Sequence, residues 1–205
     1  MSKKVLKRSL ILASASKRRS EILHSCGISH KVVASEADEI VEIRAHRAEW
    51  VVKKNAEIKA EKVSGEHKEA IVIGADTLVL LKDELIGKPK NEVEARSLLE
   101  RLSGQRVEVF TAIFLMDGLS GKSVLGVEKS SLYVKKMTVE EIDRFFVYLA
   151  PYDKAGGFSI EGVGSMLFDD IRGSYFNILG LPMGTLRDLF VGIGLDILDF
   201  ISIQG

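Results

Sequence analysis

The run Ile71–Leu81, IVIGADTLVLL, is the stretch that decides the fold, because its β-branched and aliphatic residues predict a buried strand. Asp76 interrupts this run. An isolated carboxylate in an apolar strand is costly unless it is paired or solvated. A purely structural explanation for Asp76 is that it lies on an edge strand or in a strand-end turn at 74–76. We favour a functional one, in which Asp76 ligates a metal, activates water, or does both.

Strands and helices are interspersed on both sides of this run. The expected strands are 9–13, 31–34, 107–116 and 123–134. The expected helices are about 19–25, 45–63, 91–102, 138–149 and 182–191. The strands at 107–116 and 123–134 flank a Gly-containing loop and predict a hairpin, which excludes a purely parallel sheet. The predicted fold class is therefore α/β with a mixed sheet.

Capping residues support the helix boundaries. Gly27 is placed to end the first helix. Asn91 with Glu94, and Thr138 with Glu141, have the spacing of a capping box, in which two side chains satisfy backbone N–H groups at a helix start.

The composition restricts the class of protein. The chain of 205 residues suits one domain, or one domain with two lobes. Lys plus Arg and Asp plus Glu both number 29, so attraction for an anion must come from local clusters. The single cysteine, Cys26, excludes an internal disulfide and is consistent with a reducing cytosol. The 4 histidines show no metal-ligand spacing, so neither Ser-His-Asp chemistry nor a His-rich zinc site is expected.

No segment predicts a membrane protein. The N-terminal MSKKVLKRSLILAS has an apolar run of about six residues, which is too short for a signal peptide. No apolar stretch approaches the roughly 20 residues that span a bilayer. We expect a soluble, cytoplasmic protein.

A basic turn, Ser14-Ala15-Ser16-Lys17-Arg18-Arg19, lies between the first strand and the first helix. Free N–H groups at a helix start, together with hydroxyls and cations, suit a polyphosphate. The alternative is an N-cap serine beside a solvated basic turn. Neither a Walker A loop nor a GxGxxG loop is present.

Three weaker segments could complete such a site. They are Lys88 in Gly87-Lys88-Pro89, the stretch Asp153-Lys154-Ala155-Gly156-Gly157, and the acidic Glu36-Ala37-Asp38-Glu39. Taken alone, Lys88 and the acidic stretch are more often solvated loops, and the alternative for 153–157 is an exposed turn with a weak surface ion pair. Together with Asp76 and the basic turn, they supply what hydrolysis of a phosphoanhydride requires: cations for phosphate, and carboxylates for a metal and for water.

Taken in order, these segments resemble the Maf family of septum-formation-inhibitor-like proteins. The matching segments are LASASKRRSEIL, Asp38-Glu39, NAEIKA, GADTLVLLKDELIGKP, LLERLSGQRVEVFTA, DKAGGFSIEG and IRGSYFNILGLP. The family's opening motif has proline where this chain has Lys17. The match runs from about Leu10 to Leu189.

The resemblance implies an elongated, two-lobed mixed α/β fold in a single domain over 1–205, with a central cleft, similar to inosine-triphosphate pyrophosphatase. It implies hydrolysis of a nucleoside triphosphate to monophosphate and pyrophosphate, assisted by Mg²⁺ or Mn²⁺, and a homodimer. Asp76 corresponds to the residue that activates water and binds the metal, and Glu39 to a metal-linked carboxylate. The phosphate-binding or charge-stabilising positions are Ser14, Arg18, Arg19, Lys59 and Lys88.

The positions that set base specificity are mixed. Family members acting on dTTP and UTP carry Arg, Thr and Gln, where this chain has Arg18, Thr77 and Glu161. Members acting on 7-methyl-GTP have Glu at the third position, with Trp and Gln at the other two. An ionised glutamate only accepts hydrogen bonds, whereas glutamine also donates. The resemblance leans towards pyrimidines and leaves ordinary or modified nucleotides open.

A non-enzymatic role is the competing hypothesis. A cell-division regulator that binds nucleic acid or a protein partner would use the basic segment Lys3, Lys4, Lys7 and Arg8. The zero net charge and the lack of a recognised nucleic-acid module argue against it. The apolar C-terminal GIGLDILDFISIQG is expected to pack either on the body of the protein or on a second subunit.

Overall fold

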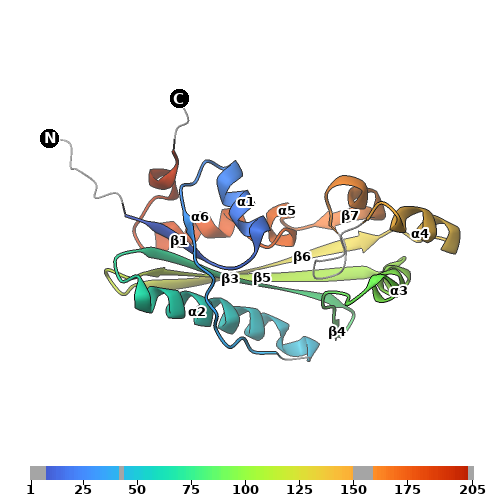
Figure 1. The fold of residues 1–205 in the computed structure, drawn as a ribbon, viewed down its shortest axis with the longest axis horizontal. Coiled ribbons are helices and arrows are strands. Elements are labelled where there is room, and N and C mark those ends of the chain that lie inside the picture. Colours follow the sequence, from blue (N-terminus) through green and yellow to red (C-terminus); the bar gives the residue numbers. More distant parts are fainter. Residues whose placement is uncertain (1–7, 42–43, 150–158, 203–205) are drawn as a thin grey trace.

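A computed structural model describes residues 8–41, 44–149 and 159–202. An open sheet of 7 strands runs through the molecule in the order β2-β1-β3-β5-β6-β7, with β4 paired to β3 (Figure 1). The strands are β1 Leu10–Ala13, β2 Lys31–Val32, β3 Ile71–Leu81, β4 Glu84–Leu85, β5 Arg106–Asp117, β6 Ser123–Val134 and β7 Phe168–Arg172. β1 pairs in parallel with β2 and β3, while β3, β5, β6 and β7 pair antiparallel. The mixed α/β sheet is therefore confirmed.

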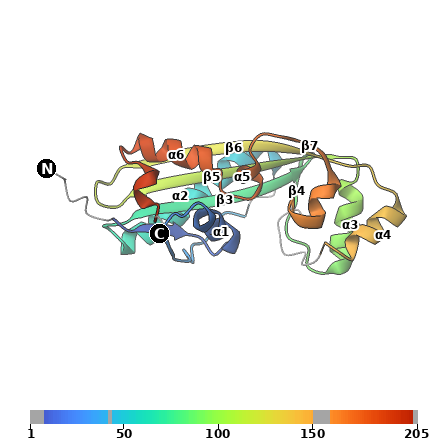
Figure 2. The same ribbon diagram turned by 90° about the horizontal axis from the view of Figure 1, so that it is seen from above.

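Helices cover both faces of this sheet. They are α1 Lys17–Ser25, α2 Ala48–Glu66, α3 Glu92–Leu102, α4 Val139–Phe146, α5 Tyr175–Ile178 and α6 Met183–Gly192. Short 3₁₀ helices span Ala45–Arg47, Gly162–Leu167 and Ile197–Phe200. In Figure 1, α2 lies below the sheet and α1, α5 and α6 lie above it. Figure 2 shows that α3 and α4 lie beside one end of the long strands, so the molecule is elongated with a second lobe there.

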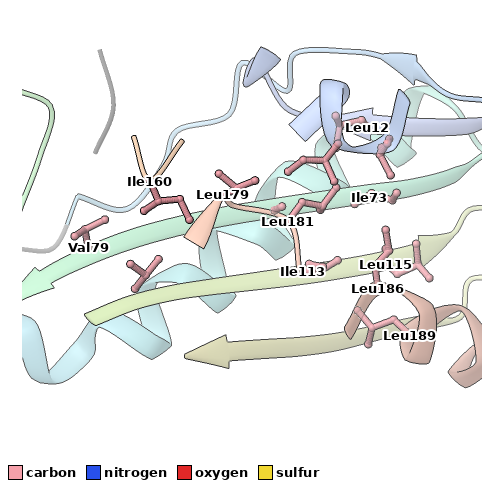
Figure 3. Packing of buried hydrophobic residues seen from close by; sticks show 14 of the residues in the cluster. Leu12, Ile73, Val79, Ile113, Leu115, Ile160, Leu179, Leu181, Leu186 and Leu189 are labelled. Carbon is pink, nitrogen blue, oxygen red and sulfur yellow. The ribbon is translucent and has the colours of Figure 1, made fainter. Parts of the chain in front are cut away.

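Alternation along β3 divides the core between the two faces, because successive side chains of a strand point to opposite sides. Ile71, Ile73 and Val79 belong to the cluster that contains α6 residues, whereas Val72 packs in the cluster with Ala56 of α2. Figure 3 shows Ile73, Ile113 and Leu115 on the strands, with Leu181 and Leu186 over them. The dense packing on both sides holds β3 as a rigid support for Asp76.

For the long strands, the boundaries predicted from the sequence agree closely with those in the structure. Ile71–Leu81 and Ser123–Val134 are strands as predicted, and the hairpin partner extends over Arg106–Asp117. Gly27 adopts φ +69° after α1 and donates its N–H to His24 O. Because this left-handed conformation costs glycine little, Gly27 ends the helix as predicted.

Several shorter predictions were wrong in extent. The strand expected at 31–34 is confined to Lys31–Val32, and the helix expected to reach 149 ends at Phe146. The box at Thr138 and Glu141 is complete, but the one at Asn91 is only half formed. There Glu94 accepts the N–H of Lys90, one residue before the cap. β4, β7 and α5 were not predicted, because two to five residues carry too little periodicity to identify an element.

The C-terminal segment packs on the body of the protein. Ile193 and Ile197 belong to the main core cluster. Ser29 donates its N–H to Phe200 O, and Ser202 donates to Gly27 O, so the last described residues secure the turn that follows α1. None of the helices in the described part of the chain is both long and apolar enough to cross a bilayer.

Candidate active site

A cleft of about 1010 Å³ opens beside β3 at the point where β1 stops. Its lining includes polar residues from the basic turn, α1, the acidic stretch 36–39, α2, β3 and the loop after β4. These residues include Ser14, Ser16, Lys17, Arg18, Arg19, Glu21, Glu36, Glu39, Lys59, Asp76, Thr77 and Lys88. The lining also includes an apolar set: Val79, Leu99, Leu102, Val107, Val109, Leu132, Val134, Ile160, Leu167, Phe168, Ile178 and Leu179. The basic turn and Asp76 thus share one cleft, as expected from the sequence.

The sheet topology explains how an aspartate can occupy β3. Pairing between β1 and β3 ends at Ala13 and Gly74. From there on, the chain of β1 turns away into α1, and the edge of β3 faces the cleft. Asp76 lies two residues past this point with 7% of its surface exposed. Its carboxylate can reach polar partners, which removes the cost of burying it alone.

Those partners come from α2. Lys59 Nζ lies 2.8 Å from Asp76 Oδ1, and Asn55 Nδ2 donates to Asp76 Oδ2 at 3.2 Å. Asn55 and Lys59 are four residues apart and therefore share one face of the helix. Gly74 allows this face to approach, because a Cβ there would lie 2.1 Å from Ala56 O.

The acidic loop reaches the same point. Glu39 Oε2 lies 2.8 Å from Lys59 Nζ, so Glu39 and Asp76 flank one ammonium group. Asn55 also fixes the loop, accepting the N–H of Ile40 at 2.8 Å and donating to Ile40 O at 3.2 Å. Asn55 was not predicted. Its spacing from Lys59 was the only sequence signal available.

Arg19 is held at three points. Its Nε donates to Gly180 O at 2.8 Å, Nη1 to Ser14 Oγ at 3.0 Å, and Nη2 to Thr77 Oγ1 at 2.9 Å. Burial lowers the pKa of Arg19, and the negative charges of Asp76 and Glu39 oppose this shift. Arginine stays protonated even so. No described carboxylate lies within ion-pair distance of Arg19, so its buried positive charge faces the cleft without a direct counter-ion.

Arg18, in contrast, has an acidic partner. Its Nη2 lies 3.5 Å from Glu161 Oε2, and its Nη1 donates to Ser159 Oγ at 3.3 Å. Tyr175 OH donates to Glu161 Oε1 at 3.4 Å. Burial raises the pKa of Tyr175, and the charge of Glu161 raises it further. Glu161 therefore lies beside Arg18, whereas Thr77 contacts Arg19.

Lys88 is exposed at the edge of the cleft and makes no hydrogen bond or ion pair with another described residue. The stretch Asp153-Lys154-Ala155-Gly156-Gly157 lies outside the described residues. Of the described residues that the sequence predicted for the site, Asp38 and Glu161 are absent from the cleft lining.

Comparison with known proteins agrees with this geometry. The family model of Maf-like proteins matches residues 9–192. The chain belongs to the Maf family. It is similar to proteins named dTTP/UTP pyrophosphatase from Dictyoglomus thermophilum, at 38% identity over 94% of this chain and 100% of the relative, and Clostridioides difficile, at 40% over 88% and 92%. A third, from Alkaliphilus metalliredigens, is 41% identical over 88% of this chain and 93% of the relative.

Proposed function

We propose that this Maf protein hydrolyses a nucleoside triphosphate to its monophosphate and pyrophosphate. The observation that carries the proposal is the shared cleft, in which the Asp76 carboxylate and the Arg19 guanidinium are both buried and both reach the cavity. The names of the relatives, dTTP/UTP pyrophosphatases, support the same reaction.

Asp76 is the candidate base. Both of its oxygens already accept one hydrogen bond, yet a carboxylate offers about four acceptor sites and can also take a proton from water. The oxygen of that water would bond to the α-phosphorus, the bond from the α-phosphorus to the bridging oxygen would break, and pyrophosphate would leave. Arg18, Arg19, Lys59 and Lys88 would offset the charge on the phosphates, an effect that usually carries most of the catalysis in phosphoryl transfer.

A divalent cation fits the two carboxylates near Lys59. Among the described residues, no three His, Cys, Asp or Glu side chains form a metal cluster. Mg²⁺, however, is commonly held by one or two carboxylates together with substrate phosphates and water. Glu39 and Asp76, each 2.8 Å from Lys59 Nζ, supply that donor set. The bound cation would neutralise phosphate charge, and either Mg²⁺ or Mn²⁺ satisfies this requirement.

We infer a preference for pyrimidine nucleotides, because Arg18 and Thr77 match the dTTP/UTP group and the relatives carry that name. The apolar residues of the cleft lining suit an aromatic base. Glu161 departs from that group, and its carboxylate lies 3.5 Å from Arg18 Nη2. A modified pyrimidine remains within the proposal.

The regulatory alternative is not favoured. Lys3, Lys4 and Lys7 lie outside the described residues, and Arg8 is engaged by Asp117 in an ion pair. A cytoplasmic location remains a prediction from the sequence, and a homodimer remains a prediction from the family.

Release of pyrophosphate, measured across common and modified nucleotides with Mg²⁺, with Mn²⁺ and with a chelator, tests the proposal. We expect Asp76→Asn to lower turnover by roughly 10²–10⁴, the usual contribution of a general base. Asp117→Asn is the matched control, since Asp117, like Asp76, is a buried aspartate paired with a basic side chain, here Arg8 instead of Lys59, but lies at the other end of β5 from the cleft. Wild-type turnover in Asp76→Asn would exclude its role. DNA binding with steep salt dependence and no pyrophosphate from any nucleotide would favour the regulator.

A further inference from the structure

A chain of buried hydroxyl and amide groups leads from Arg19 away from the cleft. Thr77 Oγ1, which accepts from Arg19, lies 3.0 Å from Thr111 Oγ1 on the neighbouring strand β5. Thr111 Oγ1 donates to Asn177 O of α5 at 3.0 Å. Thr111 and Asn177 are both 0% exposed, so neither can contact substrate.

Proton counting sets the direction of these bonds. A threonine hydroxyl has one proton to donate. Thr111 gives its proton to Asn177 O, so Thr77 must donate to Thr111. The Thr77 proton then points away from Arg19, and a lone pair is left for the guanidinium. Without the Thr111 hydroxyl, the Thr77 proton would lose this acceptor, and the hydroxyl would be held in place by the Arg19 contact alone among the described residues.

Asn177 anchors the second contact of Arg19. Its Nδ2 donates to Val109 O at 3.1 Å and to Ser130 Oγ at 2.8 Å, which ties α5 to β5 and β6. Its backbone O also accepts the N–H of Gly180 at 2.9 Å, and Gly180 O accepts from Arg19 Nε. Gly180 has φ +98°, and a Cβ there would lie 3.2 Å from Thr77 Oγ1 and 3.6 Å from Arg19 Nε, so the Gly180 backbone passes close to both Thr77 and Arg19.

One atom in this network has no partner. Asn177 Oδ1 is buried and makes no hydrogen bond. Burying an unsatisfied amide oxygen costs about 1–3 kcal/mol relative to leaving it in water, as a general magnitude. An apolar side chain would avoid that cost but would lose both donors. The presence of an amide at this buried position is therefore explained by its Nδ2, which donates to Val109 O and Ser130 Oγ and so holds α5 on the sheet.

We propose that Thr111 and Asn177 are positioning residues for Arg19. They fix two of its three acceptors, the Thr77 hydroxyl and the Gly180 carbonyl, so that the desolvated guanidinium keeps one orientation. The inference rests on the proposed function only in taking Arg19 as a phosphate ligand.

Thr111→Val tests the proposal, because valine fills the same volume without the hydroxyl. The Arg19 Nε–H resonance, assigned by its loss in Arg19→Lys, should exchange slowly with solvent in the wild type and about tenfold faster in Thr111→Val. The value of kcat/KM should fall about tenfold, equivalent to about 1.4 kcal/mol, within the range for a buried group left without its partner. In the Arg19→Lys background, Thr111→Val should lower kcat/KM by less than about twofold, since the effects of coupled residues are not additive.

Thr111→Ser, which restores the hydroxyl, should recover most of the rate. Thr185→Val is the matched control, because Thr185 donates to Glu128 outside the network. If Thr111→Val does not fold, Thr111→Ala replaces it. Equal losses in both Arg19 backgrounds, or unchanged Nε–H exchange, would overturn the proposal. If the wild type releases no pyrophosphate, the proposed function fails, and the exchange rates alone decide the positioning role.

Discussion

Gly74→Ala probes the close packing of α2 on β3, on which the position of Lys59 and Asn55 beside Asp76 depends. The added Cβ would lie 2.1 Å from Ala56 O and 2.9 Å from Ala60 Cβ, whereas ordinary contact begins near 3.4 Å. Helix α2 must therefore move away from β3 by about 1.3 Å. Since Lys59 and Asn55 are on α2, their 2.8 Å and 3.2 Å contacts with Asp76 would lengthen towards or beyond 4 Å, as an estimate of about the same shift.

The expected cost has two parts. Overpacking a tight core costs about 1–3 kcal/mol, which lowers Tm by about 4–8 °C at 2 kcal/mol in a chain of this size. Misplacing catalytic groups by about 1 Å can also cost up to about 10²-fold in rate. Calorimetry and pyrophosphate release below the transition separate the two effects.

The control for Gly74→Ala is in the same helix. Gly65 lies in α2, and a Cβ there meets nothing within 4 Å. Gly65→Ala should therefore leave the rate unchanged and raise stability by at most about 0.5–1 kcal/mol, the gain for a helix interior, because Gly65 is the last but one residue of α2. A Gly74→Ala protein with wild-type Tm and rate would refute the argument that close packing at this glycine positions Lys59 and Asn55.

Two further predictions follow from charged pairs. Glu161→Gln removes the carboxylate beside Arg18 and should raise kcat/KM for dTTP or UTP relative to other nucleotides; an unchanged ranking would count against Glu161 as a specificity residue. The Arg8 guanidinium holds the pKa of Asp117 well below its ordinary value. The resulting stability is present in full above the unfolded pKa of about 3.9 and is lost as the pH falls towards the folded pKa. Asp117→Asn should therefore cost roughly 2 kcal/mol in urea unfolding at pH 7 and about 1 kcal/mol less at pH 3; an equal cost at both pH values would exclude the ion pair as the cause.

The local sequence was sufficient to predict a strand or a helix start wherever the signal lies within that element. The run at Ile71–Leu81 contains enough β-branched residues to predict a strand, and Thr138 with Glu141 predicts a helix start, because both depend on neighbouring residues only. Asp76 was recognisable for the same reason. A carboxylate in an apolar strand requires a partner wherever that strand lies.

The identity of the partners was decided by tertiary structure. Asn55 and Lys59 reach Asp76 because α2 packs over Gly74, and Arg19 is oriented by Thr111 and Asn177 from 92 and 158 positions away along the chain. No local pattern distinguishes these polar residues from ordinary solvated ones. Their role arises only when packing removes water from them, because a buried donor or acceptor must then find its partner within the protein.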